Sequence, residues 1–317
     1  MKENKNLILN INPTDFIVIT FSLFLSILNI IYSNKIVYWQ NNLIVNLLII
    51  TYVFFVAYKD VNNNNIIWKH LHYWYLVPLI LIFFKELYYM VDPIRGVIYD
   101  DVLIKIDRMI FKTDPTHELY KIANPYLTEL LQIVYGTFFF LPIILGLDLI
   151  FNGKLKELDY SAFIIVYGFI LSYIGYILVP AIGPRFTLHN FELNDIELPG
   201  LCLTNFLREV VNSGESIPSG TLNPAAVVQR DAFPSGHTQM TLLVMILSVK
   251  YKSRMRHFFI LDGILLIFAT VYLRYHYVVD LIGGFMFMLF TLWSGKYIYN
   301  WWNKKAEKLF FRIIEKN

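Results

Sequence analysis

Charged side chains are scarce in this chain, and so is cysteine. Lysine, arginine, aspartate and glutamate together make up 16% of the 317 residues, whereas 56% of the residues are hydrophobic. In soluble domains about a quarter of the residues are charged. The composition therefore excludes an ordinary soluble domain and favours an integral membrane protein. The only cysteine, Cys202, excludes an internal disulfide, and we expect it only to pack. The net charge of +3 is too small to indicate nucleic-acid binding, so the expected partners are membrane lipids.

The first fifteen residues lack the basic stretch, short apolar core and small-residue cleavage site of a removable signal peptide. We therefore expect the first apolar segment to stay as an anchor. Charge-free runs near the roughly 20 residues that span hydrocarbon lie at 16–34, 36–58, 130–147, 160–184 and 232–249. Three further runs contain isolated ionisable groups and lie at 71–90, 258–273 and 280–295. The sequence thus predicts an all-α, polytopic membrane bundle of about eight transmembrane helices.

Basic residues near the ends of these runs predict the orientation, because lysine and arginine are retained on the cytoplasmic side. Lysines and arginines gather on one side of the predicted bundle, most densely at 250–256 and after residue 295. Both termini are therefore expected in the cytoplasm of a bacterial cell, with the protein in its inner membrane.

The segment 97–112 mixes apolar and charged residues at helical spacing, which favours a helix lying in the interface or a solvated connector. Asp107 is interpreted as a charge on that helix, and Asp262 as a partner of the basic loop.

The stretch 233–237, Phe-Pro-Ser-Gly-His, stands at the start of an apolar run. Ser235 and Gly236 are expected to leave backbone N–H groups free at a helix N-terminus, where the helix dipole favours an anion such as phosphate. His237 would lie within one turn of that anion and could donate a proton to a departing oxygen. A plain helix N-terminus with an interfacial histidine is the alternative.

A second stretch, 274–280, brings His276 and Asp280 four residues apart. On a helix they would share one face, so that the carboxylate could hold one imidazole nitrogen and leave the other free to attack. Two metal ligands or a structural pair are the alternatives. Arg185 directly follows a long apolar run, and a guanidinium binds phosphate oxygens in pairs. Its alternative is an arginine that snorkels to the interface.

Three blocks in this order, 183–185 (Gly-Pro-Arg), 234–237 (Pro-Ser-Gly-His) and 276–280 (His-Tyr-Val-Val-Asp), resemble the type 2 phosphatidic acid phosphatases. Within that family, the three blocks resemble the branch that includes the inositol phosphorylceramide synthases. The resemblance implies a six-helix core. It makes His276 the nucleophile, Asp280 its orienting partner and His237 the acid, with Arg185, Ser235 and Gly236 binding phosphate. The implied division is two additional helices in 1–65, a catalytic bundle in 66–298 and a basic amphipathic cytoplasmic tail in 299–317.

The chain departs from the phosphatase pattern at two positions. Leu178 stands where that pattern has a lysine, and Thr270 stands where it has an arginine. Because phosphoryl transfer depends on neutralising charge, other cations should replace the two that are missing. The candidates are Arg274, Arg230 and Lys85. Lys85 lies inside an apolar run, where an ionisable residue is often functional, although it could instead pair with Glu86 or snorkel.

These residues predict a lipid-phosphate phosphatase that works through a phosphohistidine on the extracytoplasmic face and needs no metal or other cofactor. The long loop 187–229 could cover the site and select the substrate. The first alternative is a phosphotransferase that moves a phospholipid head group, such as inositol phosphate, to a lipid alcohol such as ceramide. The second is a lipid transporter. A vanadium haloperoxidase shares the histidine arrangement but is soluble. The other histidines, His70, His72, His117, His189 and His257, are interpreted as surface or interface residues.

Overall fold

The structure is a computed structural model that describes residues 11–63 and 65–314. It is 76% helical, and the described ranges contain no strand. The all-α prediction is therefore confirmed. The described residues divide into two compact units: the first lies within 1–94, 162–170 and 290–317, and the second comprises 95–161 and 171–289. The predicted division at residues 65 and 298 stays a prediction.

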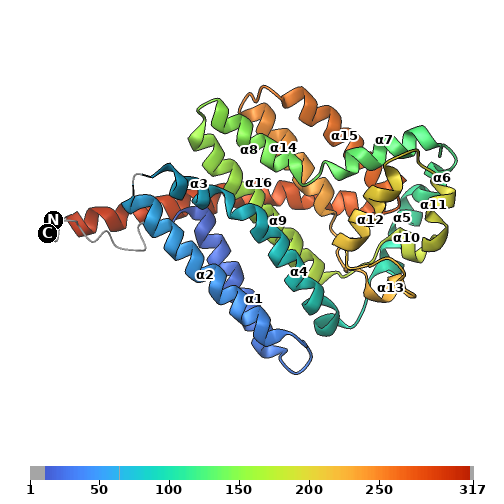
Figure 1. Ribbon diagram of the computed structural model, residues 1–317, viewed down its shortest axis with the longest axis horizontal. Coiled ribbons are helices and arrows are strands. Elements are labelled where there is room, and N and C mark those ends of the chain that lie inside the picture. Colours follow the sequence, from blue (N-terminus) through green and yellow to red (C-terminus); the bar gives the residue numbers. More distant parts are fainter. Residues whose placement is uncertain (1–10, 64, 315–317) are drawn as a thin grey trace. The chain divides into compact units, whose positions relative to one another are not determined.

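The first unit is built on two antiparallel helices, α1 (Pro13–Ile31) and α2 (Trp39–Asn62), which lie side by side in Figure 1. A capping box starts α1: Asn12 accepts from the backbone N–H of Asp15 at 2.8 Å, and Asp15 accepts from that of Asn12 at 3.0 Å. Two further helices follow, α3 (Ile66–Trp74) and α4 (Leu76–Arg95). The middle of α9 (Leu155–Leu178) and the distal part of α16 (Val278–Ile314) complete the unit.

His72 lies inside the first unit, so its interpretation as a surface or interface residue is wrong. Its side chain is 8% exposed, with one ring nitrogen 2.9 Å from Asp15 and the other 2.8 Å from Asp60. Tyr75 donates a further hydrogen bond to Asp15 at 2.8 Å. The sequence did not indicate this burial because the two carboxylates stand 57 and 12 residues before the histidine.

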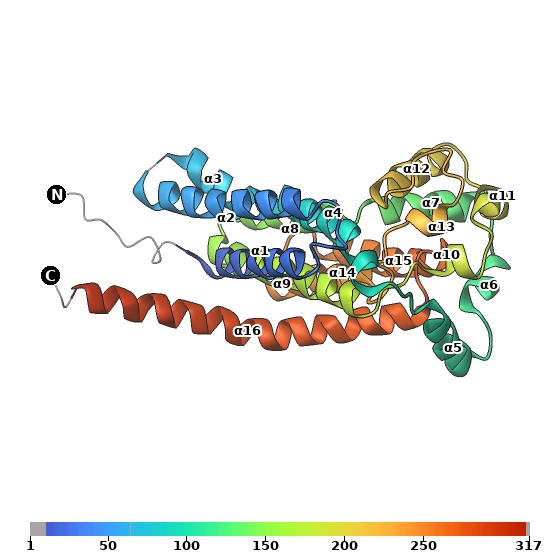
Figure 2. The same ribbon diagram turned by 90° about the horizontal axis from the view of Figure 1, so that it is seen from below.

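The second unit consists of shorter helices and contains all three sequence blocks. Figure 2 shows α12 lying along α7 in this unit. Besides the ends of α9 and the start of α16, its elements are α5 (Asp100–Phe111), α6 (Pro115–Tyr120), α7 (Pro125–Gly136), α8 (Phe140–Phe151), α10 (Pro184–Thr187), η2 (Phe191–Leu193), α11 (Asn194–Glu197), α12 (Thr204–Gly214), α13 (Pro224–Val227), α14 (Gly236–Lys250) and α15 (Arg256–Tyr272).

Several helices are long and apolar enough to cross a membrane. Five single segments of the described chain pass that test, at 13–31, 39–62, 66–95, 155–178 and 278–305, and α7 with α8 forms a sixth that is bent by 56°. The run 130–147, predicted as one span, is therefore broken at 137–139. The helices α14 and α15 have 15 and 17 residues, short of the roughly 20 that a span needs. The membrane character is supported, while the count of eight stays a prediction.

Two minor interpretations also change. Asp262 is buried and accepts a hydrogen bond from the hydroxyl of Thr137 at 2.8 Å, where an ion pair with the basic loop was expected. Thr137 stands at the break between α7 and α8, which brings its hydroxyl to α15. Cys202 is exposed and does not serve as a packing residue.

Candidate functional site

The helix N-terminus expected at the Pro-Ser-Gly-His block is present, with Ser235 as the N-cap of α14. The Ser235 hydroxyl accepts from the backbone N–H of Thr238 at 3.2 Å. Gly236 is the first helical residue, and a Cβ added there would stand 2.3 Å from the Tyr176 hydroxyl oxygen. A larger side chain at this position would have to displace Tyr176, so this block is packed closely against α9, and His237 follows in the first turn.

The second block starts a helix later than predicted. Because α16 begins at Val278, His276 precedes the helix and does not share a helical face with Asp280. Asp280 lies in the first turn, where its carboxylate accepts from the backbone N–H of Tyr277 at 2.8 Å. Its backbone carbonyl accepts from the N–H of Ser235 at 2.9 Å. Asp280 therefore connects the two blocks through these hydrogen bonds, in addition to its predicted role of orienting His276.

Asp107 has a structural role that the sequence did not indicate. Its carboxylate accepts from the backbone N–H groups of Val278 and Val279 at 2.9 and 2.8 Å, and its side chain is 2% exposed. These are two of the N–H groups that a helix start leaves without intrahelical partners. The interpretation of Asp107 as a surface charge on α5 is therefore wrong: it caps α16 from 171 residues away in the chain.

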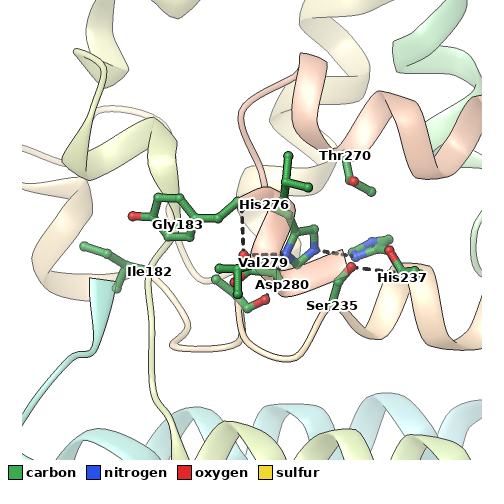
Figure 3. A network of polar contacts seen from close by, with 12 residues as sticks. Ile182, Gly183, Ser235, His237, Thr270, His276, Val279 and Asp280 are labelled. Atoms are coloured by element: carbon green, nitrogen blue, oxygen red, sulfur yellow. Dashed lines mark hydrogen bonds and ion pairs between the residues drawn. The ribbon is translucent and has the colours of Figure 1, made fainter. Parts of the chain in front are cut away.

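The two site histidines face each other (Figure 3). His276 Nε2 lies 3.3 Å from His237 Nδ1. The other ring nitrogen of His276, Nδ1, lies 2.9 Å from the carbonyl oxygen of Ala232 and 3.4 Å from an Asp280 carboxylate oxygen. A carbonyl can only accept, so the Nδ1–H donates to Ala232. The proton on Nδ1 leaves a lone pair on Nε2, which points toward His237 and accepts the hydrogen bond from its Nδ1–H.

Burial keeps His276 neutral. It lowers the pKa of this imidazole to about 4, against the opposing influence of Asp231 and of the Ala232 carbonyl, while Arg185 lowers it further. The histidine is therefore uncharged at neutral pH, which is the state a nucleophile needs.

Aromatic side chains form one wall of the site. The His237 ring stacks on Tyr135 with ring centroids 4.6 Å apart and lies 4.2 Å from the Phe138 ring. Tyr135 in turn stacks on Tyr275 at 4.3 Å. Tyr135 comes from the end of α7, Phe138 from the break that follows it and Tyr275 from the loop before His276. The sequence offered no signal for them, because an aromatic residue in an apolar run is indistinguishable from a packing residue.

Arg185 is 3% exposed, so the snorkelling alternative is wrong. Its backbone N–H donates to the Arg274 carbonyl at 3.1 Å, which places it beside the second block. The guanidinium donates to Asn212 at 2.9 Å and pairs with the carboxylate of Glu215. It also lies over the Tyr275 ring, 4.7 Å from the centroid. The arginine therefore already binds an oxyanion, supplied by the loop 187–229.

Asp100 ties the Gly-Pro-Arg block to the His block, and the sequence did not reveal it. Its carboxylate accepts from the backbone N–H groups of Ile182 and Gly183 at 3.0 and 2.8 Å and from the Tyr277 hydroxyl at 2.8 Å. Gly183 has φ of +90°, and a Cβ there would lie 2.6 Å from the Tyr275 carbonyl oxygen. Glycine is therefore required by both conformation and space.

The three cations predicted to replace the missing lysine and arginine lie in different surroundings. Arg274 is buried, adopts a positive φ of 67° and pairs with Glu197, another carboxylate of the loop 187–229. The Arg230 guanidinium donates to the Val228 carbonyl at 3.0 Å. Lys85 belongs to the first unit, on α4, with its ammonium over the Tyr88 ring. The roles of all three cations stay predictions.

The two departures from the phosphatase pattern also find a place in the structure. The backbone carbonyl of Thr270 accepts from the N–H groups of Tyr275 and His276 at 2.9 and 3.0 Å, which folds the loop back onto the end of α15. The carbonyl of Leu178 accepts from the guanidinium of Arg95 at 3.1 Å. A cation is thus present at the Leu178 backbone, although it comes from another helix.

Comparison with known families decides the classification. The model of a family described as the PAP2 superfamily matches residues 102–294, more than half of the chain. This chain belongs to the PAP2 superfamily. Superfamily members are phosphatases or phosphotransferases, and all three blocks lie in the matched range. No match was found among curated proteins or among solved structures.

Proposed function

We propose that the protein is an integral membrane lipid-phosphate phosphatase that works through a phosphohistidine on His276. The observation that carries this proposal is the orientation of the two imidazoles: His276 Nδ1 is held by Ala232 and Asp280, while Nε2 points at His237 from 3.3 Å. One nitrogen is thereby available for attack, and a second imidazole stands where a proton can be given or taken.

In the first step the lone pair of His276 Nε2 attacks phosphorus. A P–N bond forms, the bond from phosphorus to the leaving oxygen breaks, and His237 gives that oxygen a proton. The bound phosphate favours the protonated form of His237, because a nearby negative charge stabilises an imidazolium. The phosphorylated imidazole gains positive charge, which the nearby Asp280 carboxylate stabilises.

In the second step His237 takes a proton from a water molecule, whose oxygen attacks phosphorus. The P–N bond breaks, inorganic phosphate leaves and His276 regains its lone pair. Electrostatic stabilisation comes from Arg185, from the start of α14 at Ser235 and Gly236, and from Arg274. Glu215 now occupies the guanidinium of Arg185, and in this proposal a phosphate oxygen takes the place of that carboxylate.

A lipid substrate suits a site carried by a chain with several candidate membrane spans. The charge distribution of the loops supports an extracytoplasmic site, as the sequence predicts. Head groups would then reach the histidines sideways from the outer leaflet.

One observation favours a second candidate, transfer of a phosphorylated head group to a lipid alcohol. Asn212 and Glu215 contact Arg185 and offer oxygen acceptors next to the guanidinium that is proposed to bind phosphate. Such groups could bind the hydroxyls of a polyol such as inositol. The departures at Leu178 and Thr270 point toward the same synthase-like branch. In this case the acceptor that His237 activates is an alcohol such as ceramide.

The full-length protein in detergent, supplied with labelled lipid phosphates, tests both candidates. We expect label on the protein that is labile to acid and stable to alkali, and we expect His276→Ala to abolish it. His257→Ala removes an exposed histidine and should leave the label unchanged. Label that survives in His276→Ala would overturn the nucleophile assignment. Lipid transport by the same protein in sealed vesicles, with no phosphate turnover, would favour the transporter alternative.

The reaction products then distinguish the phosphatase from the phosphotransferase. Phosphatidic acid, an isoprenoid diphosphate, phosphatidylglycerol phosphate and phosphatidylinositol with ceramide form the substrate panel. Released inorganic phosphate identifies the phosphatase, and a new phosphodiester identifies the transferase.

A further inference from the structure

The first unit buries a polar cluster that the proposed chemistry does not use. It consists of Asn29 on α1, Asn42 and Asn46 on α2, and Glu86 on α4. Their side chains are 0%, 7%, 0% and 5% exposed. All four lie in helices long and apolar enough to cross a membrane, where a buried charge without a partner is costly.

The hydrogen bonds of the cluster are incomplete at two atoms. Glu86 Oε1 accepts from the amides of Asn29 and Asn46 at 2.9 and 2.8 Å, and Asn29 Oδ1 accepts from Asn42 at 2.9 Å. Within the described part of the chain, Glu86 Oε2 and Asn46 Oδ1 are buried and have no hydrogen-bond partner. Both orphan atoms are oxygens, and they belong to two side chains that are already joined by one hydrogen bond.

A single proton can satisfy both atoms. A neutral carboxylic acid has one O–H donor, and a carboxamide has one oxygen acceptor beside its N–H donors. If Oε2 carries a proton and donates it to Asn46 Oδ1, acid and amide exchange two hydrogen bonds. An ionised carboxylate offers no donor, so Asn46 Oδ1 would remain buried without a partner, which is unfavourable.

The charged groups on the three helices engage other partners. Asp15, the only ionisable residue of α1, and Asp60 of α2 both pair with His72. The ammonium of Lys59 lies over the rings of Phe55 and Trp68. On α4, the ammonium of Lys85 lies 5.8 Å from the Tyr88 ring centroid. The remaining ionisable residues of α2 and α4 are Tyr52, Tyr58, Tyr89, Asp92 and Arg95. The hydrogen bonds to Glu86 Oε1 come from neutral amides, which compensate an ionised carboxylate less than a cation would.

We propose that Glu86 is a proton-binding site inside the first unit, held as a neutral carboxylic acid that pairs with Asn46. Asn29 donates to the carbonyl oxygen of the acid, and Asn42 orients Asn29. The ligand of this site is H⁺. The proposal does not depend on the phosphoryl chemistry of the second unit, so either can fail without the other.

Infrared difference spectroscopy on the full-length protein in lipid nanodiscs tests the assignment. The spectrum of the wild type minus Glu86→Gln at pH 7 should contain the C=O stretch of one protonated carboxylic acid and no ionised carboxylate band. Glu192→Gln is the matched control, because Glu192 is exposed and its loss should remove a carboxylate band instead. Asn46→Leu keeps the acid and removes its partner, so the C=O stretch should shift to higher frequency. This second variant reports on Glu86 even if Glu86→Gln does not fold.

Two results would overturn the proposal. A carboxylate band in place of the acid band at pH 7 would show that Glu86 is ionised. An acid band that disappears when sodium chloride replaces choline chloride at equal ionic strength would make the cluster a sodium site. Persistence of the acid band in both salts, with the shift in Asn46→Leu, supports the proton site.

Discussion

The pH dependence of phosphorylation follows from the burial of His276. Only the neutral imidazole has a lone pair on Nε2, and burial lowers the pKa of this group from 6.5 to about 4. Nucleophilic reactivity is therefore fully present at neutral pH and is lost as the pH falls through about 4. At pH 5 about 90% of His276 is neutral, whereas an ordinary histidine would be about 3% neutral. The burial of one ring thus predicts an approximately 30-fold difference in reactive enzyme at pH 5.

Rapid-quench measurement of the phosphorylated protein isolates this step. A 4-nitrophenyl phosphate ester serves as substrate, because a good leaving group needs no proton from His237. The phosphorylation rate at pH 5 should stay close to its value at pH 7. Asp231→Asn provides the matched comparison: Asp231 raises the pKa of His276, so the variant should lose activity at a lower pH than the wild type. Ionisation of the substrate is common to both proteins and cancels.

A midpoint near 6.5 in the wild type that moves to a lower pH in Asp231→Asn would refute this account, because it would mean that the titrating group is His276 and that it is accessible to water. Identical midpoints in the wild type and Asp231→Asn would show that the observed titration belongs to another group or to the substrate.

Three further changes test the neighbouring residues. His237→Ala should slow turnover of a lipid phosphate by about 10²–10⁴-fold but should retain phosphorylation by a 4-nitrophenyl ester; equal losses with both substrates would contradict its role as the acid. Glu215→Gln removes the carboxylate that competes for Arg185, so the KM for lipid phosphate should fall in initial-rate assays, and an unchanged KM would contradict the proposed displacement. Asp107→Asn weakens the cap of α16 and should cost about 1.5–3 kcal/mol of unfolding free energy, measured by denaturation against Asp101→Asn, an exposed neighbour that should be neutral.

The apolar runs were sufficient to predict an all-helical membrane bundle, because the helix type and the burial of these segments follow from local composition. The break between α7 and α8 was missed, although Gly136 and Pro142 flank residues 137–139 and both residue types interrupt helices. The start of α16 was also misplaced. Its position depends on Asp107, a cap that is remote in the sequence.

The order of the three blocks, and the residue types at His237, His276 and Asp280, could be read from the sequence because each is a short local pattern. The sequence did not reveal which other groups complete the site. Asp100 and Asp107 bind backbone N–H groups from segments about 80 and 170 residues away, and Glu197 and Glu215 neutralise two arginines from inside a loop that has no motif. The sequence by itself determined which side chains can do chemistry. The tertiary structure decided which nitrogen is free and which anion each arginine holds, because those depend on contacts between segments far apart in the chain.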